Sequence, residues 1–382
     1  MIFLFTLLIK YDKLLQEVIY MYLENLHNLI QSGVDTGAYP GATYAVILKD
    51  KVYMNVVGLK AKYPQEEVNS IDTIYDMASV SKVATTTTCI LKLIEMGKLR
   101  LFDKVQLFVP EFKYENIMVY HLVTHTSGLQ PCLYNPSQIT SKEEAWEKVL
   151  NADVNFECGS DMVYSDLNYI MLGKIVEAIS GMPLDVFAKK YIYDPLGMID
   201  TSYNPVDINR CAPTEERNDP VVQGIVRGKV HDETAYILGG VAGHAGMFST
   251  IKDMSKFLQM ILNKGTYNGN KVLSPVTVDK LFKPLASKTV GNSCMKLQRS
   301  IGWIVKDYNC SSGDLTSEET IDHTGFTGTN VWVDRINEVA FCMLSNRVHP
   351  TRNNTKHMRL RVCAANYIMA NLEEIKKEIE EC

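Results

Sequence analysis

The sequence lacks the features of several protein classes. Its nine cysteines are odd in number and form no Cys-x-x-Cys pair, which disfavours a disulfide framework or a zinc site and suits a reducing compartment. Acidic residues outnumber Lys and Arg, with a net charge of -5, so no basic face for nucleic acid is expected. No apolar run reaches the roughly 20 residues that span a bilayer. We therefore expect no nucleic-acid partner, no metal and no membrane span.

What the sequence does contain is the composition of a globular protein. Of its 382 residues, 46% are hydrophobic and 22% are charged, which is too apolar for a disordered chain. This length corresponds to one large domain or to two interleaved domains, and it is sufficient to bury a sizeable core.

The N-terminal segment is apolar but does not resemble a signal peptide. No basic region precedes residues 1–9, and no small-residue cleavage site follows them. We interpret residues 1–20 as a non-native or disordered extension, with Met21 as the natural start, because residues 16–19 can be encoded by codons that contain a ribosome-binding sequence. This interpretation predicts a cytoplasmic protein; a genuine signal would instead predict export.

Strand patterns occur at the two ends of the chain, and helical patterns fill the middle. Two β-rich runs near the N-terminus indicate a hairpin, and further runs near the C-terminus indicate strands. The expected strands are 42–49, 52–58, 300–308, 320–323, 330–336 and 339–346. Apolar spacing and capping signals predict helices at 22–31, 79–96, 166–180 and 250–262, and from about 354 to the end.

This order of elements predicts an α/β (α+β) fold with an antiparallel sheet flanked by terminal helices. Residues 21–75 and 246–382 would form the sheet domain, and residues 76–245 an inserted, mostly helical domain. A cleft between two such parts is a common place for an active site.

A Ser-x-x-Lys motif at Ser79 and Lys82 opens the helix predicted at 79–96. Residues three apart share a helix face, so the lysine nitrogen can lie beside the serine hydroxyl and activate it as a nucleophile. The motif alone has little specificity, because it also occurs at Ser249 and at Ser293. Its context distinguishes the three copies.

Two further segments supply that context. Tyr164-Ser165-Asp166 opens the amphipathic helix at 166–180, and His323-Thr324-Gly325 ends a predicted strand. A phenol can relay a proton when nearby cations lower its pKa. Tyr114 has a similar setting but lies in a loop-like stretch near Ser79, and an isolated tyrosine is more often a packed aromatic.

Taken together, these motifs resemble those of the serine β-lactamase-like hydrolases, which include class C β-lactamases, penicillin-binding DD-peptidases and esterases. The resemblance covers about residues 25–370. Supporting stretches are His121–Leu129, Gly239–Gly246, His323–Thr329 and Asn346–Asn354, the last being typical of the branch that has His-Thr-Gly in place of Lys-Thr-Gly.

The resemblance implies an acyl-enzyme mechanism without a cofactor or metal. Ser79 would attack an acyl carbonyl, while Lys82 and Tyr164 carry its proton to the leaving group and later activate water. The backbone N–H groups of Ser79 and Phe326 would form the oxyanion hole, each contributing roughly 3–4 kcal/mol.

Two departures from class C β-lactamases concern Asp166, where the family has Asn, and His323, where it has Lys. A carboxylate at position 166 is expected to keep Lys82 protonated and to oppose ionisation of Tyr164. A histidine is cationic only below about pH 6.5. Our hypothesis is that Asp166 and His323 interact directly and replace the missing lysine charge.

The expected substrate-binding residues are Asp166, His323, Thr324, Gly325 and Arg352. Gly325 would permit close approach of a substrate backbone. Arg352 could recognise a carboxylate, although an arginine near a chain end is more often solvated.

We predict structural roles for the remaining histidines. His121 and His125 have the i,i+4 spacing of a zinc helix but lack the accompanying Glu, so packing and turn hydrogen bonds are expected. His231-Asp232-Glu233 is interpreted as a loop with capping roles, and His244 as part of a tight turn.

The sequence thus predicts a serine hydrolase that cleaves an amide or ester of a small molecule or peptide, such as a D-amino-acid peptide, a β-lactam or a small ester. The alternative is a penicillin-binding or sensor protein that is acylated and deacylates slowly. The oligomeric state is left open.

Overall fold

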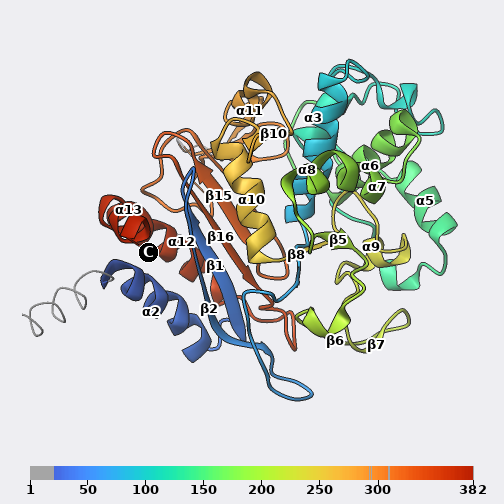
Figure 1. Cartoon of the computed structure of the whole chain (residues 1–382). Helices are drawn as coiled ribbons and strands as arrows, with labels where there is room; N and C mark the ends of the chain where they lie inside the picture. Colours follow the sequence, from blue (N-terminus) through green and yellow to red (C-terminus); the bar gives the residue numbers. More distant parts are fainter. Residues whose placement is uncertain (1–20, 292, 294, 309, 382) are drawn as a thin grey trace, which may run out of the picture.

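The computed structural model describes residues 21–381 except 292, 294 and 309. Its centre is a nine-stranded antiparallel sheet in the order β11-β12-β13-β14-β15-β16-β1-β2-β3 (Figure 1). Strand β1 from the N-terminal part pairs with β16 from the C-terminal part, with Ala42 opposite Ser345. The two ends of the chain therefore build one sheet, which confirms the predicted fold class.

The strands of this sheet are β1 (Gly41–Ile47), β2 (Val52–Ala61), β3 (Glu67–Val68), β11 (Ala286–Thr289), β12 (Lys296–Arg299), β13 (Ile304–Val305), β14 (Thr320–Thr324), β15 (Asn330–Asp334) and β16 (Val339–Ser345). Smaller sheets contain β4 (Tyr75–Asp76), β5 (Ser202–Tyr203) and β8 (Met247–Ser249), then β6 (Glu216–Asn218) with β7 (Gln223–Ile225), and β9 (Thr266–Tyr267) with β10 (Asn270–Lys271).

Helices cover both faces of the large sheet, which is why β1 is buried along its whole length. Alternate residues of β1 point to opposite faces. Tyr44 and Val46 pack in a core with α2 (Met21–Asp35), α12 (His357–Ala370) and α13 (Leu372–Glu381). Ala45 and Ile47 pack in the larger core, which contains α10 (Ile251–Leu262). Figure 1 shows α2, α12 and α13 on one side of the sheet and α10 on the other.

The remaining helices gather mainly beside the α10 face of the sheet (Figure 1). They are α3 (Thr88–Glu95), α4 (Val119–Val123), α5 (Lys142–Leu150), α6 (Asp166–Ser180), α7 (Leu184–Ala188), α8 (Asp194–Leu196), α9 (Glu233–Ile237), α10 (Ile251–Leu262) and α11 (Pro275–Leu281), with π-helical η1 (Lys82–Thr87) and η4 (Lys189–Tyr193) and short 3-10 turns η2 (Val105–Leu107), η3 (Pro136–Gln138) and η5 (Ile208–Arg210).

Three of the expected elements differ in the structure. The helix predicted at 79–96 is π-helical from Lys82 to Thr87 before it continues as α3. The strand predicted at 300–308 is wrong over most of its length, because only Ile304–Val305 pair as β13. The terminal helix is divided into α12 and α13. Residues 1–20, assigned above to an extension, lie outside the described residues. Among the described helices, none is long and apolar enough to cross a membrane.

Candidate active site

Ser79 lies three residues before the π-helical segment η1, which begins at Lys82, and it follows a strained point of the backbone. The preceding residue, Ala78, has a φ of 46°, a left-handed conformation that is costly for a residue with a Cβ. The Asp76 carboxylate holds this turn by accepting a hydrogen bond of 2.8 Å from the Ala78 amide and one of 2.7 Å from the His231 amide. The strain is therefore held by buried contacts, and it presents the Ser79 hydroxyl toward a cavity.

Lys82 is fully buried beside that hydroxyl, as the Ser-x-x-Lys spacing predicts. Its Nζ donates hydrogen bonds of 2.9 Å to Ser79 Oγ and 2.9 Å to the backbone carbonyl of His244, and it lies 2.7 Å from Asp166 Oδ1. Three oxygen atoms from three segments thus hold the lysine nitrogen. The Asp166 carboxylate is its ion-pair partner.

Tyr164 completes this group of side chains. Its ring centroid lies 5.0 Å from Lys82 Nζ and 4.7 Å from the ring centroid of His125. His125 is buried and has a φ of 59°, and its Nδ1 accepts a hydrogen bond of 3.1 Å from the amide of Ser165. His125 therefore fixes the position of the phenol by packing and a turn hydrogen bond, in agreement with the structural role predicted for it.

The electrostatics of the site favour a protonated lysine and a neutral phenol. Burial alone would lower the pKa of Lys82, but Asp166 and Tyr164 together raise it above its ordinary value. Burial raises the pKa of Tyr164; Lys82 and Ser79 oppose this change, and Asp166 adds to it. Asp166 thus raises the pKa of both Lys82 and Tyr164, which is the direction expected from the sequence.

Two backbone amides are free to bind an oxyanion. Within the described part of the chain, the amides of Ser79 and Phe326 donate to no protein acceptor. Both residues line the two cavities that open beside the serine hydroxyl. Free amide donors in such a place suit the negative charge that develops on a carbonyl oxygen during acyl transfer.

The loop that carries Phe326 is joined to the segment before Ser79. Thr327 Oγ1 donates a hydrogen bond of 2.7 Å to the carbonyl of Asp76, and Thr329 Oγ1 donates one of 3.0 Å to the carbonyl of Met77. A Cβ at Gly325 would lie 2.5 Å from that Met77 oxygen. Gly325 is thus required for contact with the protein's own backbone, whereas the sequence suggested contact with a substrate.

The hypothesis that Asp166 pairs with His323 is wrong. Asp166 pairs with Lys82, and His323 Nδ1 donates a hydrogen bond of 2.9 Å to the carbonyl of Thr324. His323 is buried, and burial together with the charges of Arg299 and Lys82 holds its pKa well below its ordinary value. A neutral histidine therefore occupies the position where the resemblance led us to expect a replacement for the lysine charge.

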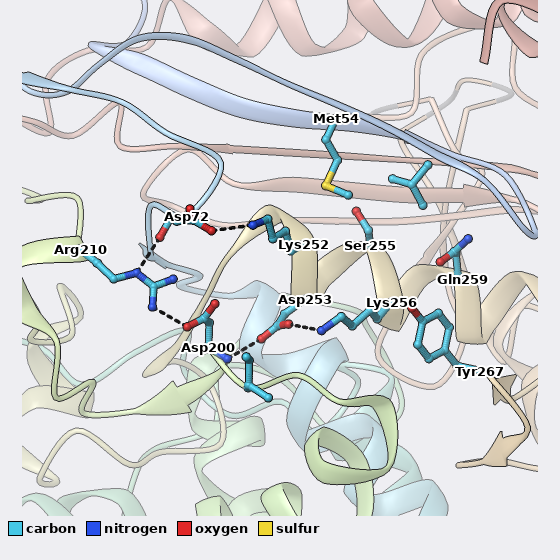
Figure 2. A pocket seen from close by; sticks show the side chains of 12 residues that line it. Met54, Asp72, Asp200, Arg210, Lys252, Asp253, Ser255, Lys256, Gln259 and Tyr267 are labelled. Carbon is cyan, nitrogen blue, oxygen red and sulfur yellow. Dashed lines mark hydrogen bonds and ion pairs between the residues drawn. The ribbon is translucent and has the colours of Figure 1, made fainter. Parts of the chain in front are cut away.

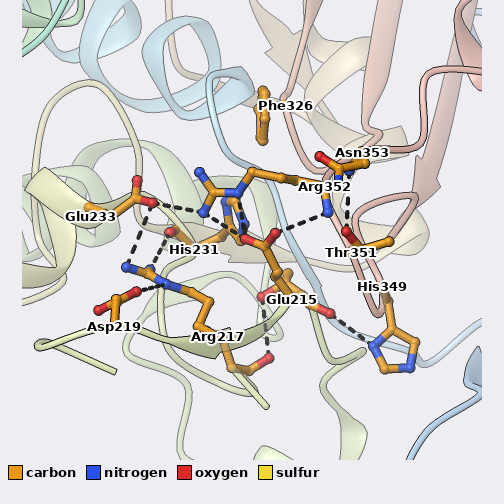
Figure 3. A network of polar contacts seen from close by, with 12 residues as sticks. Glu215, Arg217, Asp219, His231, Glu233, Phe326, His349, Thr351, Arg352 and Asn353 are labelled. Carbon is orange, nitrogen blue, oxygen red and sulfur yellow. Dashed lines mark hydrogen bonds and ion pairs between the residues drawn. The ribbon is translucent and has the colours of Figure 1, made fainter. Parts of the chain in front are cut away.

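Arg352 is also not a free cation. Its guanidinium forms ion pairs of 2.6 Å with Glu215 and 2.7 Å with Glu233 (Figure 3). Glu215 in addition binds His231 Nε2 at 3.0 Å, and the His231 ring stacks on Phe326 with centroids 5.6 Å apart. The predicted carboxylate recognition by Arg352 is thus replaced by a structural role beside Phe326.

Arg347, which sequence reasoning did not single out, holds the other side of Phe326. Its Nε donates a hydrogen bond of 2.8 Å to the Phe326 carbonyl, and its guanidinium carbon lies 4.4 Å from the centre of the ring. Only its place in the Asn346–Asn354 stretch pointed to this residue.

The alternative motifs do not form a comparable site. Ser249 Oγ lies 2.8 Å from the hydroxyl of Thr201, while Lys252 forms an ion pair of 2.7 Å with Asp72. Ser293 Oγ donates to the carbonyl of Val290 at 2.6 Å. The Tyr114 hydroxyl donates to a backbone carbonyl at 3.0 Å.

A larger cavity of about 830 Å³ lies away from Ser79, between β2 and α10. Figure 2 shows that its charged side chains form ion pairs with one another. Lys252 is paired with Asp72, and Lys256 lies 2.9 Å from Asp253. Ser255 donates to a backbone carbonyl at 2.8 Å, so this cavity contains no serine next to a base.

The cleft at Ser79 consists of two adjoining cavities of about 440 and 460 Å³, and Ser79, Tyr164 and Phe326 line both. Asp166 and Arg352 line the first cavity, whereas His323, Thr324 and Gly325 line the second. The structure therefore brings all the predicted site residues to one cleft. The arrangement is a half-buried serine hydroxyl beside a fully buried lysine, with a phenol and two free amides.

Comparison with known proteins agrees with this geometry. The Beta-lactamase family model matches residues 26–366. An N-acetylmuramyl-L-alanine amidase of Bacillus subtilis (strain 168) is 29% identical over 86% of this chain and 81% of its own length. A putative D-alanyl-D-alanine carboxypeptidase of Salmonella schwarzengrund (strain CVM19633) is 30% identical over 87% of this chain and 84% of its own length.

Solved structures show the same fold at low sequence identity. EstCE1, a hydrolase with promiscuous acyltransferase activity, has a TM-score of 0.74 at 18% identity, covering 92% of this chain and 99% of its own. The octameric penicillin-binding protein homologue from Pyrococcus abyssi has a TM-score of 0.70 at 19% identity, covering 94% and 78%. The chain belongs to the β-lactamase family and is a serine hydrolase of that family.

Proposed function

We propose that the protein hydrolyses an amide bond through an acyl-enzyme on Ser79. The observation that carries this proposal is the single cluster in which Lys82 Nζ contacts both Ser79 Oγ, at 2.9 Å, and Asp166 Oδ1, at 2.7 Å. The cluster lies beside the two free amides of Ser79 and Phe326. It supplies a nucleophile, a base and an oxyanion hole, which acyl transfer requires.

The ion pair suggests how the resting ammonium becomes a base. The Lys82 ammonium transfers a proton to the Asp166 carboxylate, and the neutral amine takes the proton of Ser79 as its oxygen attacks the carbonyl. Tyr164 then protonates the leaving amine and regains a proton from Lys82, and Asp166 returns its proton to the lysine. The net result is transfer of the serine proton to the leaving group.

In the second half of the reaction, the same groups activate water. The Lys82 amine, formed again by proton transfer to Asp166, takes a proton from water as its oxygen attacks the acyl carbon. The bond between this carbon and Ser79 Oγ then breaks, the serine oxygen regains a proton from Lys82, and Asp166 returns its proton to the lysine. The backbone amides of Ser79 and Phe326 bind the oxyanion in both halves.

The two relatives described above suggest the class of amide. Their names describe one bond between N-acetylmuramic acid and L-alanine and another between two D-alanines. Both bonds are amides with an alanine on at least one side. We therefore propose an amide next to alanine, in a cell-wall fragment or a D-amino-acid peptide, as the substrate.

Intact-mass spectrometry tests the proposal. The wild-type protein is mixed with p-nitrophenyl acetate, N-acetylmuramyl-L-alanine, N-acetyl-D-alanyl-D-alanine or a fluorescent penicillin. We expect a transient adduct with the ester and product release with at least one of the amides; the S79A variant forms no adduct. A stable adduct would instead indicate the slowly deacylating penicillin-binding protein, and no adduct at Ser79 would contradict both functions.

A further inference from the structure

The side chain of Phe326 stands where the two cavities of the cleft meet. It lines both cavities, together with Ser79 and Tyr164. Its exposed fraction is 50%. Of the other large hydrophobic residues that are exposed in the described part of the chain, none lines both cavities. Phe326 therefore presents an aromatic surface beside the nucleophile, in addition to its backbone amide.

The ring is held by polar neighbours and belongs to neither hydrophobic core. The ring of His231 stacks on it at an interplanar angle of 23°. The guanidinium carbons of Arg347 and Arg352 lie 4.4 and 6.0 Å from its centre. Stacking and cation–π contacts of this kind favour one position of an aromatic ring. The exposed aromatic side chain is thus fixed in place.

The groups that hold the ring are themselves fixed by charged partners (Figure 3). Glu215 binds His231 Nε2 at 3.0 Å and pairs with Arg352, which also pairs with Glu233. The His231 amide donates to the carboxylate of Asp76. Moving His231 or Arg352 away from the ring would break these contacts, most of which are only partly exposed to water.

The backbone on either side of Phe326 is also held. Its carbonyl accepts a hydrogen bond from Arg347 Nε. The Gly325 amide donates to the carbonyl of Thr329 at 2.8 Å, and the Gly328 amide donates to the carbonyl of Gly325 at 3.0 Å. A substrate group that overlapped the ring would have to displace this bonded structure, which is costly. The ring is therefore a rigid wall and can discriminate between substrates by size.

The proposed reaction places the scissile bond next to this wall. The carbonyl oxygen of the substrate binds the backbone amide of Phe326, and the ring belongs to the same residue. The acyl substituent and the leaving group are both bonded to the carbon of that carbonyl. They extend into the two cavities, and the ring stands at the junction. Branches close to the carbonyl are therefore the parts of a substrate that meet the ring.

We propose that the Phe326 ring limits the size of the groups next to the scissile bond. Methyl-sized groups pass beside the ring, and larger branched groups are rejected. The proposal rests on the proposed function and deepens it, because it gives a structural reason for an amide next to alanine. Phe326 then has two separate roles: its amide binds the oxyanion, and its side chain determines specificity.

The rate of adduct formation at Ser79, followed by intact-mass spectrometry, tests the size limit. The acyl side is probed with p-nitrophenyl acetate against p-nitrophenyl 3-methylbutanoate. The leaving side is probed with phenyl acetate against 2-isopropylphenyl acetate. For each pair, the preference is the ratio of the rate constants of the small and the large ester. A change in reactivity that is common to both esters, such as a shifted oxyanion donor, cancels in this ratio.

Variants assign the preference to the ring. We expect F326A to lower the preference about tenfold for at least one pair, since hydrophobic pockets discriminate by about that much for small changes in size. F326L should retain part of it. F102A is the matched control, because Phe102 is exposed, stacks on Tyr120 and lines neither cavity; its preference should equal that of the wild type.

The stacking partner gives a second test that leaves Phe326 unchanged. H231N removes the ring that stacks on Phe326, and it should lower the same preference by a smaller factor than F326A. H231F restores an aromatic ring at this position and should retain more of the preference than H231N. Thermal unfolding verifies that each variant is folded.

The proposal is overturned if folded F326A keeps both preferences, or if it prefers the small esters more strongly than the wild type does, because the ring would then attract large groups. A change in the acyl or the leaving pair supports it and identifies the side that the ring limits. Adducts with the esters but no release of product from any amide would contradict the proposed amide hydrolysis alone. No adduct at Ser79 with any ester would contradict both.

Discussion

The hydroxyl of Thr327 donates a hydrogen bond of 2.7 Å to the backbone carbonyl of Asp76. This bond joins the loop after β14, which carries Phe326, to the segment that leads into Ser79. The two proposed oxyanion donors come from opposite ends of the sequence, so their spacing depends on such contacts. Thr327 is therefore a positioning residue.

We predict that T327V lowers kcat about tenfold while KM changes little, because a misplaced donor loses part of the hundredfold or greater effect of an oxyanion-hole donor. T327S, which retains the hydroxyl, serves as the control and should keep most of the activity. Steady-state kinetics with a p-nitrophenyl ester measures both. An unchanged kcat in T327V would show that the loop is held by its other contacts alone.

Replacement of Asp166 by Asn tests the proposed proton transfer from Lys82. In the wild type the proton moves within the ion pair, so kcat/KM should be independent of pH around neutrality. In D166N the lysine proton must go to solvent. The pKa of Lys82 also falls, because burial lowers it and the Asp166 carboxylate no longer raises it. We expect kcat/KM of D166N to rise about tenfold per pH unit below that pKa.

The measurement is a pH–rate profile of both proteins with a substrate that does not ionise. A flat profile for D166N across the same range would contradict a role for Asp166 as the proton acceptor. D161N is a suitable control, because Asp161 pairs with Lys288 outside the cleft cavities.

The close packing around Gly325 predicts that a side chain at this position destabilises the fold. The Cβ of G325A would lie 2.5 Å from the Met77 carbonyl oxygen, so the backbone of one segment must move. We expect a loss of about 1–3 kcal/mol in the free energy of unfolding, measured by urea denaturation, together with lower activity. An alanine variant as stable and active as the wild type would show that the two segments separate without cost.

Much of the site could be predicted from sequence because its signals are local. The helical spacing of Ser79 and Lys82 places them together, and Tyr164 precedes an amphipathic helix whose start is clear. The structure brings these three side chains to one cleft, and their catalytic roles stay predictions. The cellular location of the protein and its lack of a cofactor also stay predictions.

The charge pattern of the cleft could not be predicted, because it depends on which partners meet in space. Asp166 had Lys82 and His323 as candidate partners, and only the fold shows that it pairs with Lys82. Arg352 looks like a free cation in the sequence, yet it pairs with Glu215, from a loop, and with Glu233, the first residue of α9. Arg299 and Arg361 lie in no motif, and only the folded chain shows that Arg299 Nη1 and Arg361 Nε are buried without a hydrogen-bond partner among the described residues.

The pairing of β1 with β16 has a consequence for biosynthesis. The segment that contains Ser79 is synthesised well before Phe326 and the strands β14 and β15 on either side of it. A chain that is truncated between these segments thus carries the serine without the second proposed amide donor. We therefore expect the proposed oxyanion hole to assemble only after β14, β15 and β16 have been made and β16 has paired with β1.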